Sequence, residues 1–166
     1  YGNVIGSRGS IVETLLKNKA KKVQITDKDM TRFWITLEQS FDLVLFAIKN
    51  MTGGEIFIPK IPSMKLVDLF DVMAPNAKKE IVGIRPGEKL HEALLTIHEA
   101  KRSLELKKYF VILPDLHHWD NKPNLYEKYR KNGKKLKNDF IYTSDTNKKW
   151  LSTDDFKKMV NKLKLK

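Results

Sequence analysis

The sequence predicts an α/β protein. Strand-like and helix-like stretches alternate through the first hundred residues, as they do in α/β domains. Two capping boxes, at residues 10–13 and 36–39, mark helix starts along this stretch. The chain has 166 residues, of which 41% are hydrophobic, and that is enough for one domain with a real core.

Taken in order, residues 1–5 predict the end of a strand, and a glycine-rich loop and a short helix beginning at Ser10 follow. Residues 22–26 predict a second strand. The next helix follows the capping box at Thr36 and runs to about Asn50. Its apolar residues are spaced to form one buried stripe: Leu37, Phe41, Val44, Leu45 and Ile48.

Further strands are predicted at 55–58, 80–84 and 109–113. Between them we expect two helices. The first is capped by Ser63 and has an apolar face, and the second spans 89–95. The apolar face of the first consists of Leu66, Leu69, Phe70 and Met73.

Residues 114–139 are polar, basic and aperiodic, so we interpret them as a long loop or loosely attached arm. A final helix is capped by Ser152 and runs to about Lys162, with Leu151 packing against Phe156. We therefore divide the chain into residues 1–113, with the main α/β fold, and residues 114–166, a basic arm with a C-terminal helix.

Composition excludes several classes of protein. The absence of cysteine excludes a disulfide framework, a thiolate metal site and a catalytic thiol. No apolar run is long enough to cross a bilayer, and the first residues do not form a secretory signal, so we expect a cytoplasmic protein with no membrane partner. The chain begins with Tyr1 rather than Met, and we expect it to be a fragment of a longer protein.

The formal net charge of +12 at pH 7 is unevenly placed, since residues 1–100 hold 14 basic and 12 acidic side chains and residues 101–166 hold 18 and 8. A basic chain suggests a nucleic-acid or other anion-binding module. The lysines are scattered rather than arranged in a stripe, and this pattern is typical of a solvated face. We therefore expect no nucleic-acid partner, and the basic binding module stays as an alternative.

Three segments carry residues suited to a nucleotide ligand. In the first, Asn3 precedes a small-residue loop and a helix start, where amides and Arg8 can meet an anion; a plain tight turn with a solvated Arg8 is equally compatible. In the second, Arg32 is expected in a loop between a strand and the capped helix, among aromatic residues, where it suits a pyrophosphate; the alternative is a snorkelling or stacked arginine at the surface.

The third segment is a turn that follows a predicted strand. Pro86 and Gly87 force the turn and place Arg85 and Glu88 in one loop. Arginine can bind phosphate oxygens with two parallel hydrogen bonds, and a carboxylate can accept from ribose hydroxyls, so this loop suits a nucleoside diphosphate. The alternative is a salt bridge within the loop, which is worth little at a surface.

Other catalytic signatures are missing from the sequence. No GxGxxG follows a strand, and no pair of histidines has the spacing of a zinc helix. We interpret the four histidines, among them the adjacent pair His117 and His118, as surface or packing residues. Tyr126 and Arg130 have the spacing of a Tyr-x-x-x-Lys pair but lack the lysine. We therefore predict no catalytic residue and no metal site in this chain.

Together, several segments resemble the extended short-chain dehydrogenase/reductases, and more closely the inverting UDP-N-acetylglucosamine 4,6-dehydratases that begin pseudaminic acid synthesis. The similarity covers residues 1 to about 113 and resumes at residues 145–152. It implies a fold made of the last strands of a Rossmann-type sheet and a small substrate-binding α/β domain. The segments that carry it are residues 1–10, 25–27, 30–37, 53–65 and 83–92.

The resemblance implies a role for each matched position. Arg32, Arg85 and Glu88 would hold the UDP moiety of UDP-N-acetylglucosamine, and Asn3 would contact the UDP-sugar. Five residues would lie along the nicotinamide end of bound NADP: Val4, Ile5, Gly6, Ser7 and Arg8.

The resemblance also implies a lyase and a homo-oligomeric parent protein. In that family the glycine-rich NADP loop, the Tyr-x-x-x-Lys pair and the catalytic acid all precede the segment that matches residue 1. We therefore expect this chain to be inactive by itself. Another epimerase or dehydratase of the same superfamily stays as an alternative.

Overall fold

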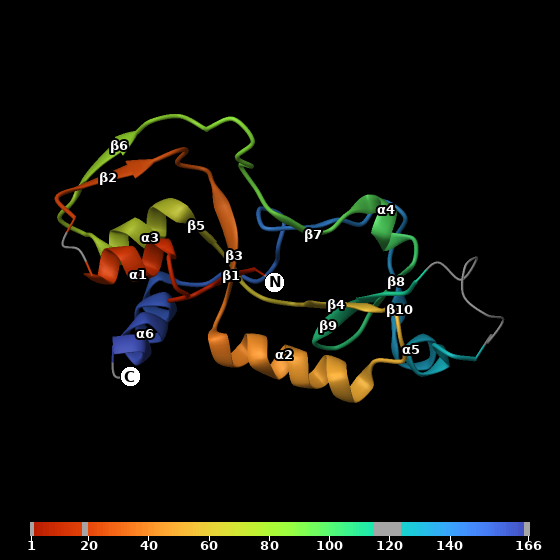
Figure 1. Ribbon diagram of the computed structural model, residues 1–166. Coiled ribbons are helices and arrows are strands. Elements are labelled where there is room, and N and C mark those ends of the chain that lie inside the picture. Colours follow the sequence, from red (N-terminus) through yellow and green to blue (C-terminus); the bar gives the residue numbers. More distant parts are fainter. Residues whose placement is uncertain (1, 18–19, 115–123, 165–166) are drawn as a thin grey trace. The chain divides into compact units, whose positions relative to one another are not determined.

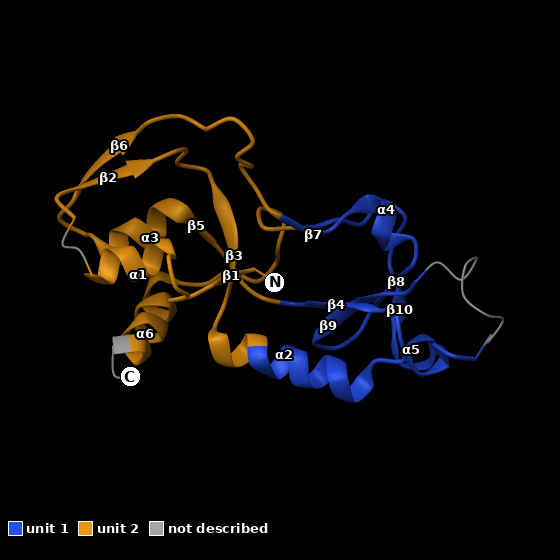
Figure 2. Cartoon of the chain, viewed as in Figure 1, with its two compact units in different colours: residues 1, 41–60, 93–142 blue, residues 2–40, 61–92, 143–166 orange. Residues whose placement is uncertain are grey.

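The computed structural model describes residues 2–17, 20–114 and 124–164, and it confirms the predicted α/β fold class (Figure 1). The chain forms two compact units (Figure 2). Unit 1 contains residues 41–60 and 93–142, and unit 2 contains residues 2–40, 61–92 and 143–166. The division of the chain into domains of residues 1–113 and 114–166 stays a prediction.

Unit 2 contains two small sheets. The first has the strand order β1-β3-β5, in which β1 (Asn3–Val4) is parallel to β3 (Thr31–Ile35) and β5 (Ser63–Lys65) is antiparallel to it. The second pairs β2 (Lys22–Ile25) with β6 (Lys78–Ile81) in parallel. The strands predicted near residues 1–5, 22–26 and 80–84 are therefore present, with boundaries shifted by a few residues.

Three helices surround the core of unit 2: α1 (Ile11–Lys17), α3 (Leu66–Met73) and α6 (Thr153–Lys164). Trp34 of β3 and Phe156 of α6 meet edge to face, with ring centroids 5.6 Å apart. The amide of Asp155 donates to Ser152 Oγ at 3.1 Å, which confirms the predicted cap. Leu151 and Phe156 belong to the same apolar cluster, as predicted.

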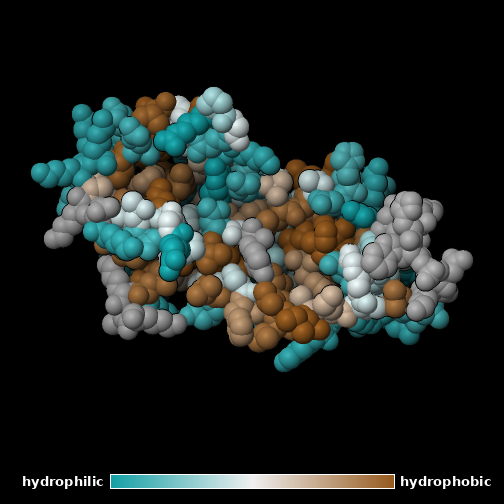
Figure 3. All heavy atoms as spheres, in the orientation of Figure 1, coloured by the Kyte–Doolittle hydropathy of each residue, from teal (hydrophilic) through white to brown (hydrophobic). Residues whose placement is uncertain are grey.

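Helix α2 (Leu37–Asn50) has the predicted start, because the Thr36 hydroxyl accepts from the amide of Gln39 and the Gln39 side chain accepts from the amide of Thr36. The predicted buried stripe is wrong. Its five members are exposed, with Leu37 at 68%, Phe41 at 61% and Ile48 at 63%. Apolar side chains gather at the surface along α2 in Figure 3.

The buried positions of α2 lie on another side of the helix. Leu43 is buried, and the Phe46 ring stacks on Tyr109 with centroids 4.3 Å apart. Helical spacing identified an apolar face, but it could not say whether anything covers that face. Among the described residues, nothing buries the stripe.

Unit 1 contains a four-stranded antiparallel sheet with the order β10-β8-β9-β4. Its strands are β4 (Ile56–Pro59), β8 (Ser103–Glu105), β9 (Tyr109–Ile112) and β10 (Lys134–Lys135). The strands predicted at 55–58 and 109–113 are confirmed. Helix α5 (Glu127–Asn132) adds Tyr129 to a core that also contains Leu104 and Val111.

Three other expectations were wrong. Residues 89–95 form bends followed by strand β7 (Ala93–Leu95) rather than a helix, because β3 binds the carbonyls of Lys89 and Leu90 and β7 pairs with strand β11 (Tyr142–Thr143). Ser63 lies within β5, and α3 begins after Lys65 without a side-chain cap. The aperiodic stretch 114–139 contains α5 and β10, whose short length gives no periodic signal.

The remaining elements are short. Helix α4 (Ile97–Ala100) begins with a capping box between Thr96 and Glu99. Strand β11 (Tyr142–Thr143) is where the chain passes from unit 1 back to unit 2. Among the described residues, no helix is long and apolar enough to span a membrane.

Candidate functional site

The turn at residues 85–88 has the predicted geometry. The amide of Glu88 donates to the carbonyl of Arg85 at 3.0 Å, which closes a four-residue turn. Gly87 has a φ of 82°, a value that the third position of a type II turn requires and that side chains disfavour. Pro86 occupies the second position, where its fixed φ favours the same turn.

The two charged side chains of this turn have different partners. Glu88 Oε2 accepts from the Arg85 amide at 3.2 Å, and Glu88 Oε1 lies 3.5 Å from the Thr26 hydroxyl. Arg85 is exposed and forms no ion pair among the described residues, so the alternative of a salt bridge within the loop is not what the structure contains. Its guanidinium is left available to an anion.

Arg32 lies in strand β3 rather than in a loop as expected, because residues 31–35 pair with β1 and β5, and its side chain is buried under the turn at residues 85–88. Its Nη2 donates to the carbonyl of Lys89 at 2.8 Å, and its Nη1 donates to the carbonyls of Leu90 at 3.1 Å and Thr31 at 2.7 Å. The Nε atom lies 3.7 Å from a carboxylate oxygen of Glu92. Arg32 is therefore neither a solvated nor a surface-stacked arginine; it anchors the segment that follows Glu88.

The opening segment lies beside the same strand. Asn3 is opposite Trp34 and Val4 is opposite Ile35 in the parallel pairing of β1 with β3, and Asn3 is exposed. Ile5 is only 2% exposed, so its side chain belongs to the core, and its amide donates to the carbonyl of Ile35 at 2.9 Å.

The loop that follows β1 is exposed at Ser7 and Arg8. Gly6 has a φ of 75°, and a Cβ there would lie 2.5 Å from Leu163 of α6, so this position is restricted to glycine. The predicted helix cap is confirmed, since Ser10 Oγ accepts from the amide of Glu13 at 3.2 Å.

A buried polar network, which sequence reasoning missed, supports this site. The Thr31 hydroxyl lies 2.8 Å from His91 Nδ1 and 2.7 Å from Ser144 Oγ, and Ser144 Oγ accepts from the amide of Glu92 at 2.9 Å. His91 is a packing residue, in line with its interpretation from the sequence. Ser144 could not have been found, because it is 113 residues from Thr31.

The segment after Ser144 is fastened to β5. Asn147 Nδ2 donates to the Ile61 carbonyl, to Ser63 Oγ and to the Lys149 carbonyl, at 2.8–2.9 Å. Burial raises the pKa of Asp145, but hydrogen bonds from Thr143 and backbone amides, and the charge of His91, outweigh it, so the pKa lies below its usual value. Residues 144–149 thus complete the frame around the site.

Unit 2 therefore brings three of the four predicted substrate residues to one place. Arg32 and Glu88 are connected through Met30 and Thr26. The Met30 sulfur accepts from Arg32 Nη2 and from the Thr26 hydroxyl, and that hydroxyl lies 3.5 Å from Glu88 Oε1. A free guanidinium beside a partly satisfied carboxylate can bind an ester phosphate and a vicinal diol. His117 and His118 lie outside the described residues.

The sequence profile of the polysaccharide biosynthesis protein family matches residues 1–114. The chain belongs to this family. It is 43% identical to a UDP-N-acetylglucosamine 4,6-dehydratase (inverting) of Campylobacter jejuni, over 97% of this chain and 49% of the relative. It is also 36% identical to a UDP-glucose 4-epimerase of Rickettsia rickettsii, over 69% of this chain and 36% of the relative.

The solved structures agree with this assignment. The X-ray structure of Pen from Bacillus thuringiensis matches this chain with a TM-score of 0.78 and 34% identity. The match covers 100% of this chain and 49% of the Pen chain. The chain thus spans about half the length of the dehydratase relative and of this structure. The family resemblance found in the sequence is confirmed.

Proposed function

We propose that this chain is the UDP-sugar-binding part of an NADP-dependent UDP-N-acetylglucosamine 4,6-dehydratase that inverts C5. The intact enzyme would be a cytoplasmic, homo-oligomeric lyase. Its 4-keto-6-deoxy UDP-sugar would serve pseudaminic acid synthesis and so surface glycans or flagellin. The observation that carries the proposal is the turn at residues 85–88, in a chain 43% identical to a dehydratase of that activity.

The substrate roles come from the family resemblance, and the geometry of the site supports them. Arg85 is exposed and without an ion-pair partner among the described residues, so it is assigned to the diphosphate. Glu88 keeps a carboxylate at the same turn and is assigned to the ribose hydroxyls. The predicted contact of Arg32 with the diphosphate stays part of the proposal, and its hydrogen bonds to Lys89 and Leu90 place it directly beneath the turn.

Asn3 and the loop that follows it are assigned to the sugar and the nicotinamide end of NADP. The exposed side chains of Ser7 and Arg8 support this assignment, whereas the side chain of Ile5 faces the core. The chemistry that bound NADP would supply is hydride transfer to and from the sugar. The residues of this chain bind and orient the sugar, and the proton-transfer groups of the proposal belong to the half of the relatives that this chain does not match.

The first test replaces the position that matches Arg85 with alanine in the full-length Campylobacter relative. Loss of a charge-assisted phosphate contact costs on the order of 1.5–3 kcal/mol, which we expect to see as a fall in kcat/KM. Unchanged kcat and KM would overturn the site assignment. Substitution at the position matching Glu88 by glutamine is the companion variant, and it should weaken binding of UDP-sugars more than binding of inorganic pyrophosphate.

Epimerisation at C4 of a UDP-sugar is a second candidate reaction, because a UDP-glucose 4-epimerase of Rickettsia rickettsii is 36% identical to this chain. Product analysis of the intact enzyme separates the two: loss of water from the sugar indicates a dehydratase, and a change at C4 alone indicates an epimerase. The non-enzymatic alternative, a basic anion-binding module, predicts binding that falls steeply with salt and shows no preference for a UDP-sugar.

A further inference from the structure

Unit 1 contains a pocket that lies outside the proposed UDP-sugar site. Its volume is about 930 Å³, and all of its lining residues lie between His98 and Lys135. Pockets that hold organic ligands have volumes of roughly 300–1,000 Å³. The space is therefore large enough for a small organic molecule.

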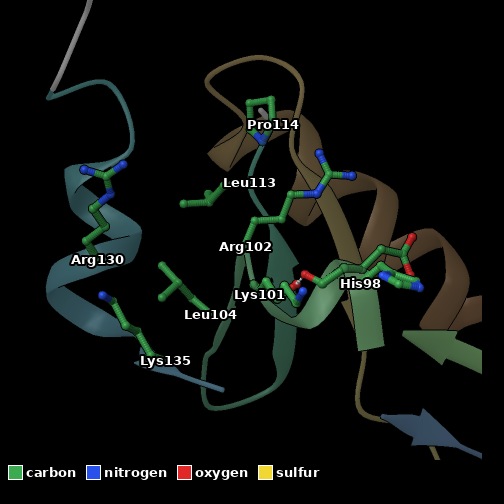
Figure 4. Close-up of a pocket in the computed structure, with 11 residues that line it drawn as sticks. His98, Lys101, Arg102, Leu104, Leu113, Pro114, Arg130 and Lys135 are labelled. Atoms are coloured by element: carbon green, nitrogen blue, oxygen red, sulfur yellow. Dashed lines mark hydrogen bonds between the residues drawn. The ribbon is translucent and has the colours of Figure 1, made fainter. Parts of the chain in front are cut away.

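The floor of the pocket is apolar. Leu104 and Leu113 are both less than 10% exposed, and Pro114 is partly buried beside them. In Figure 4 the two leucine side chains point toward helix α5. Because these residues come from the core of unit 1, the floor is a fixed surface rather than a set of loose side chains.

Four positively charged side chains line the pocket around this floor, in two pairs. Arg130 of α5 and Lys135 of β10 lie on one side of the leucines, and Lys101 and Arg102, in the turn after α4, lie on the other side (Figure 4). None of the four forms an ion pair with another described residue. Like charges around one pocket repel one another, and an anion relieves that repulsion.

One carboxylate also lines the pocket, but it is already engaged. Glu99 accepts from the Thr96 amide at 2.9 Å and from the Thr96 hydroxyl at 2.6 Å. These hydrogen bonds, and to a smaller extent the charge of Arg102, hold the pKa of Glu99 below its usual value. The carboxylate is used as a helix cap, so it cannot neutralise the two pairs of cations together.

We propose that this pocket is a binding site for a phosphate monoester with a flat apolar body. The phosphate, a dianion, would be held by Arg130 and Lys135, and the apolar body would lie on Leu104 and Leu113 and extend toward Arg102. Two cations on one side of the floor match the double negative charge of a phosphate monoester better than the single charge of a carboxylate, and the fork of the guanidinium can bind two of the phosphate oxygens. The pocket is lined by residues of unit 1, whereas the turn at residues 85–88 belongs to unit 2.

The test is an NMR titration of the full chain with two probes, phenyl phosphate and inorganic phosphate, at low salt. We expect phenyl phosphate to bind more tightly than inorganic phosphate and to shift the signals of Leu104 and Leu113. In the double variant Arg130→Gln with Lys135→Gln, we expect the affinity for phenyl phosphate to fall about a hundredfold, because two charge-assisted contacts to the phosphate are removed and each is worth about tenfold.

The matched control neutralises two neighbouring lysines that do not line the pocket, Lys131→Gln with Lys134→Gln. It removes the same net charge from the same two elements, so it should change the affinity less than twofold. Arg102→Gln, on the opposite flank, should weaken phenyl phosphate more than inorganic phosphate.

Three outcomes would overturn the proposal. The first is that neither probe binds. The second is an equal loss of affinity in the control pair and the pocket pair, which would indicate a general field effect. The third is tight binding of single-stranded RNA with loss of phenyl phosphate selectivity, which would assign the basic face to nucleic acid.

Discussion

Arg32 donates a hydrogen bond of 2.8 Å to the backbone carbonyl of Lys89, a residue 57 positions further along the chain. The bond ties strand β3 to the segment that follows the turn at residues 85–88. A buried arginine that donates to three carbonyls stabilises the backbone that it holds.

Replacing Arg32 with lysine should therefore destabilise unit 2. A lysine keeps the charge but cannot donate to the carbonyls of Lys89 and Leu90 from two separate nitrogens. We expect the free energy of unfolding to fall by about 2–3 kcal/mol, measured by denaturant titration. Arg102→Lys is the control, because Arg102 is exposed and should change the free energy by less than ~0.5 kcal/mol. A loss no larger than that of the control would show that the buried hydrogen bonds contribute nothing.

Replacing Gly87 with alanine tests the turn itself. Gly87 has a φ of 82°, and a side chain there costs about 1–2 kcal/mol in the left-handed region. A Cβ at this position meets no atom within 4 Å, so the whole cost is conformational. We expect a lower melting temperature and weaker binding of UDP-N-acetylglucosamine.

The control for the turn is Lys89→Ala, which leaves the backbone conformation and the Lys89 carbonyl in place. Lys89→Ala should change neither the melting temperature nor the binding of UDP-N-acetylglucosamine appreciably. If Gly87→Ala bound the UDP-sugar as tightly as the parent chain does, the turn would have no part in the site.

Glu55 predicts a pH dependence of stability in unit 1. Burial raises the pKa of its carboxyl, but hydrogen bonds from the amides of Gly53, Glu55 and Thr52 outweigh it, and the pKa lies below the ordinary value of 4.5. Because the folded pKa is lowered, this stabilisation is present above pH 4.5 and is lost as the pH falls through the folded pKa.

In Glu55→Gln we expect the unfolding free energy to be about 1 kcal/mol lower at pH 7, with a shallower loss between pH 5 and pH 3. Chemical denaturation across that pH range measures both. Glu127→Gln, in an exposed helical ion pair with Lys131, is the comparison variant and should leave the slope nearly unchanged. An identical acid slope in Glu55→Gln and the parent chain would contradict the assignment.

The exposed face of α2 predicts self-association of the isolated chain. Contiguous apolar surface of this kind is rare on monomers, and association buries it. We expect the sedimentation coefficient to rise with concentration, and Phe41→Glu with Ile48→Glu to abolish the rise. Lys49→Glu, which changes the charge beside the apolar face, should leave the rise in the sedimentation coefficient unchanged. A parent chain that stays monomeric at every concentration would show that the exposed face of α2 does not drive self-association.

Much of the fold could be predicted from local sequence patterns. The caps at Ser10, Thr36 and Ser152, and the turn at Pro86-Gly87, depend on residues within four positions of each other, and the structure confirms all of them. Such signals persist because the hydrogen bonds they predict close within one turn of backbone.

Interactions between distant segments could not be predicted in this way. The apolar spacing of α2 gave no information on what covers it. The segment 89–95 contains helix-forming residues, yet it is not helical, because Arg32 and Thr31 bind the carbonyls of Lys89 and Leu90 and strand β7 pairs with the distant strand β11. Ser144 and Asn147 were invisible as site residues for the same reason, since their partners are 52–113 positions away.

Unit 2 is built from three stretches of chain, and the last of them, residues 143–166, supplies Phe156 and Val160 to the core. During synthesis the ribosome therefore releases the two earlier stretches before the residues that close their core exist. Until α6 emerges, Trp34 and Leu69 lack those neighbours, and the nascent chain is most exposed to chaperones and proteases in that interval. A ribosome stalled just before residue 143 would hold a chain in which this unit is unfinished.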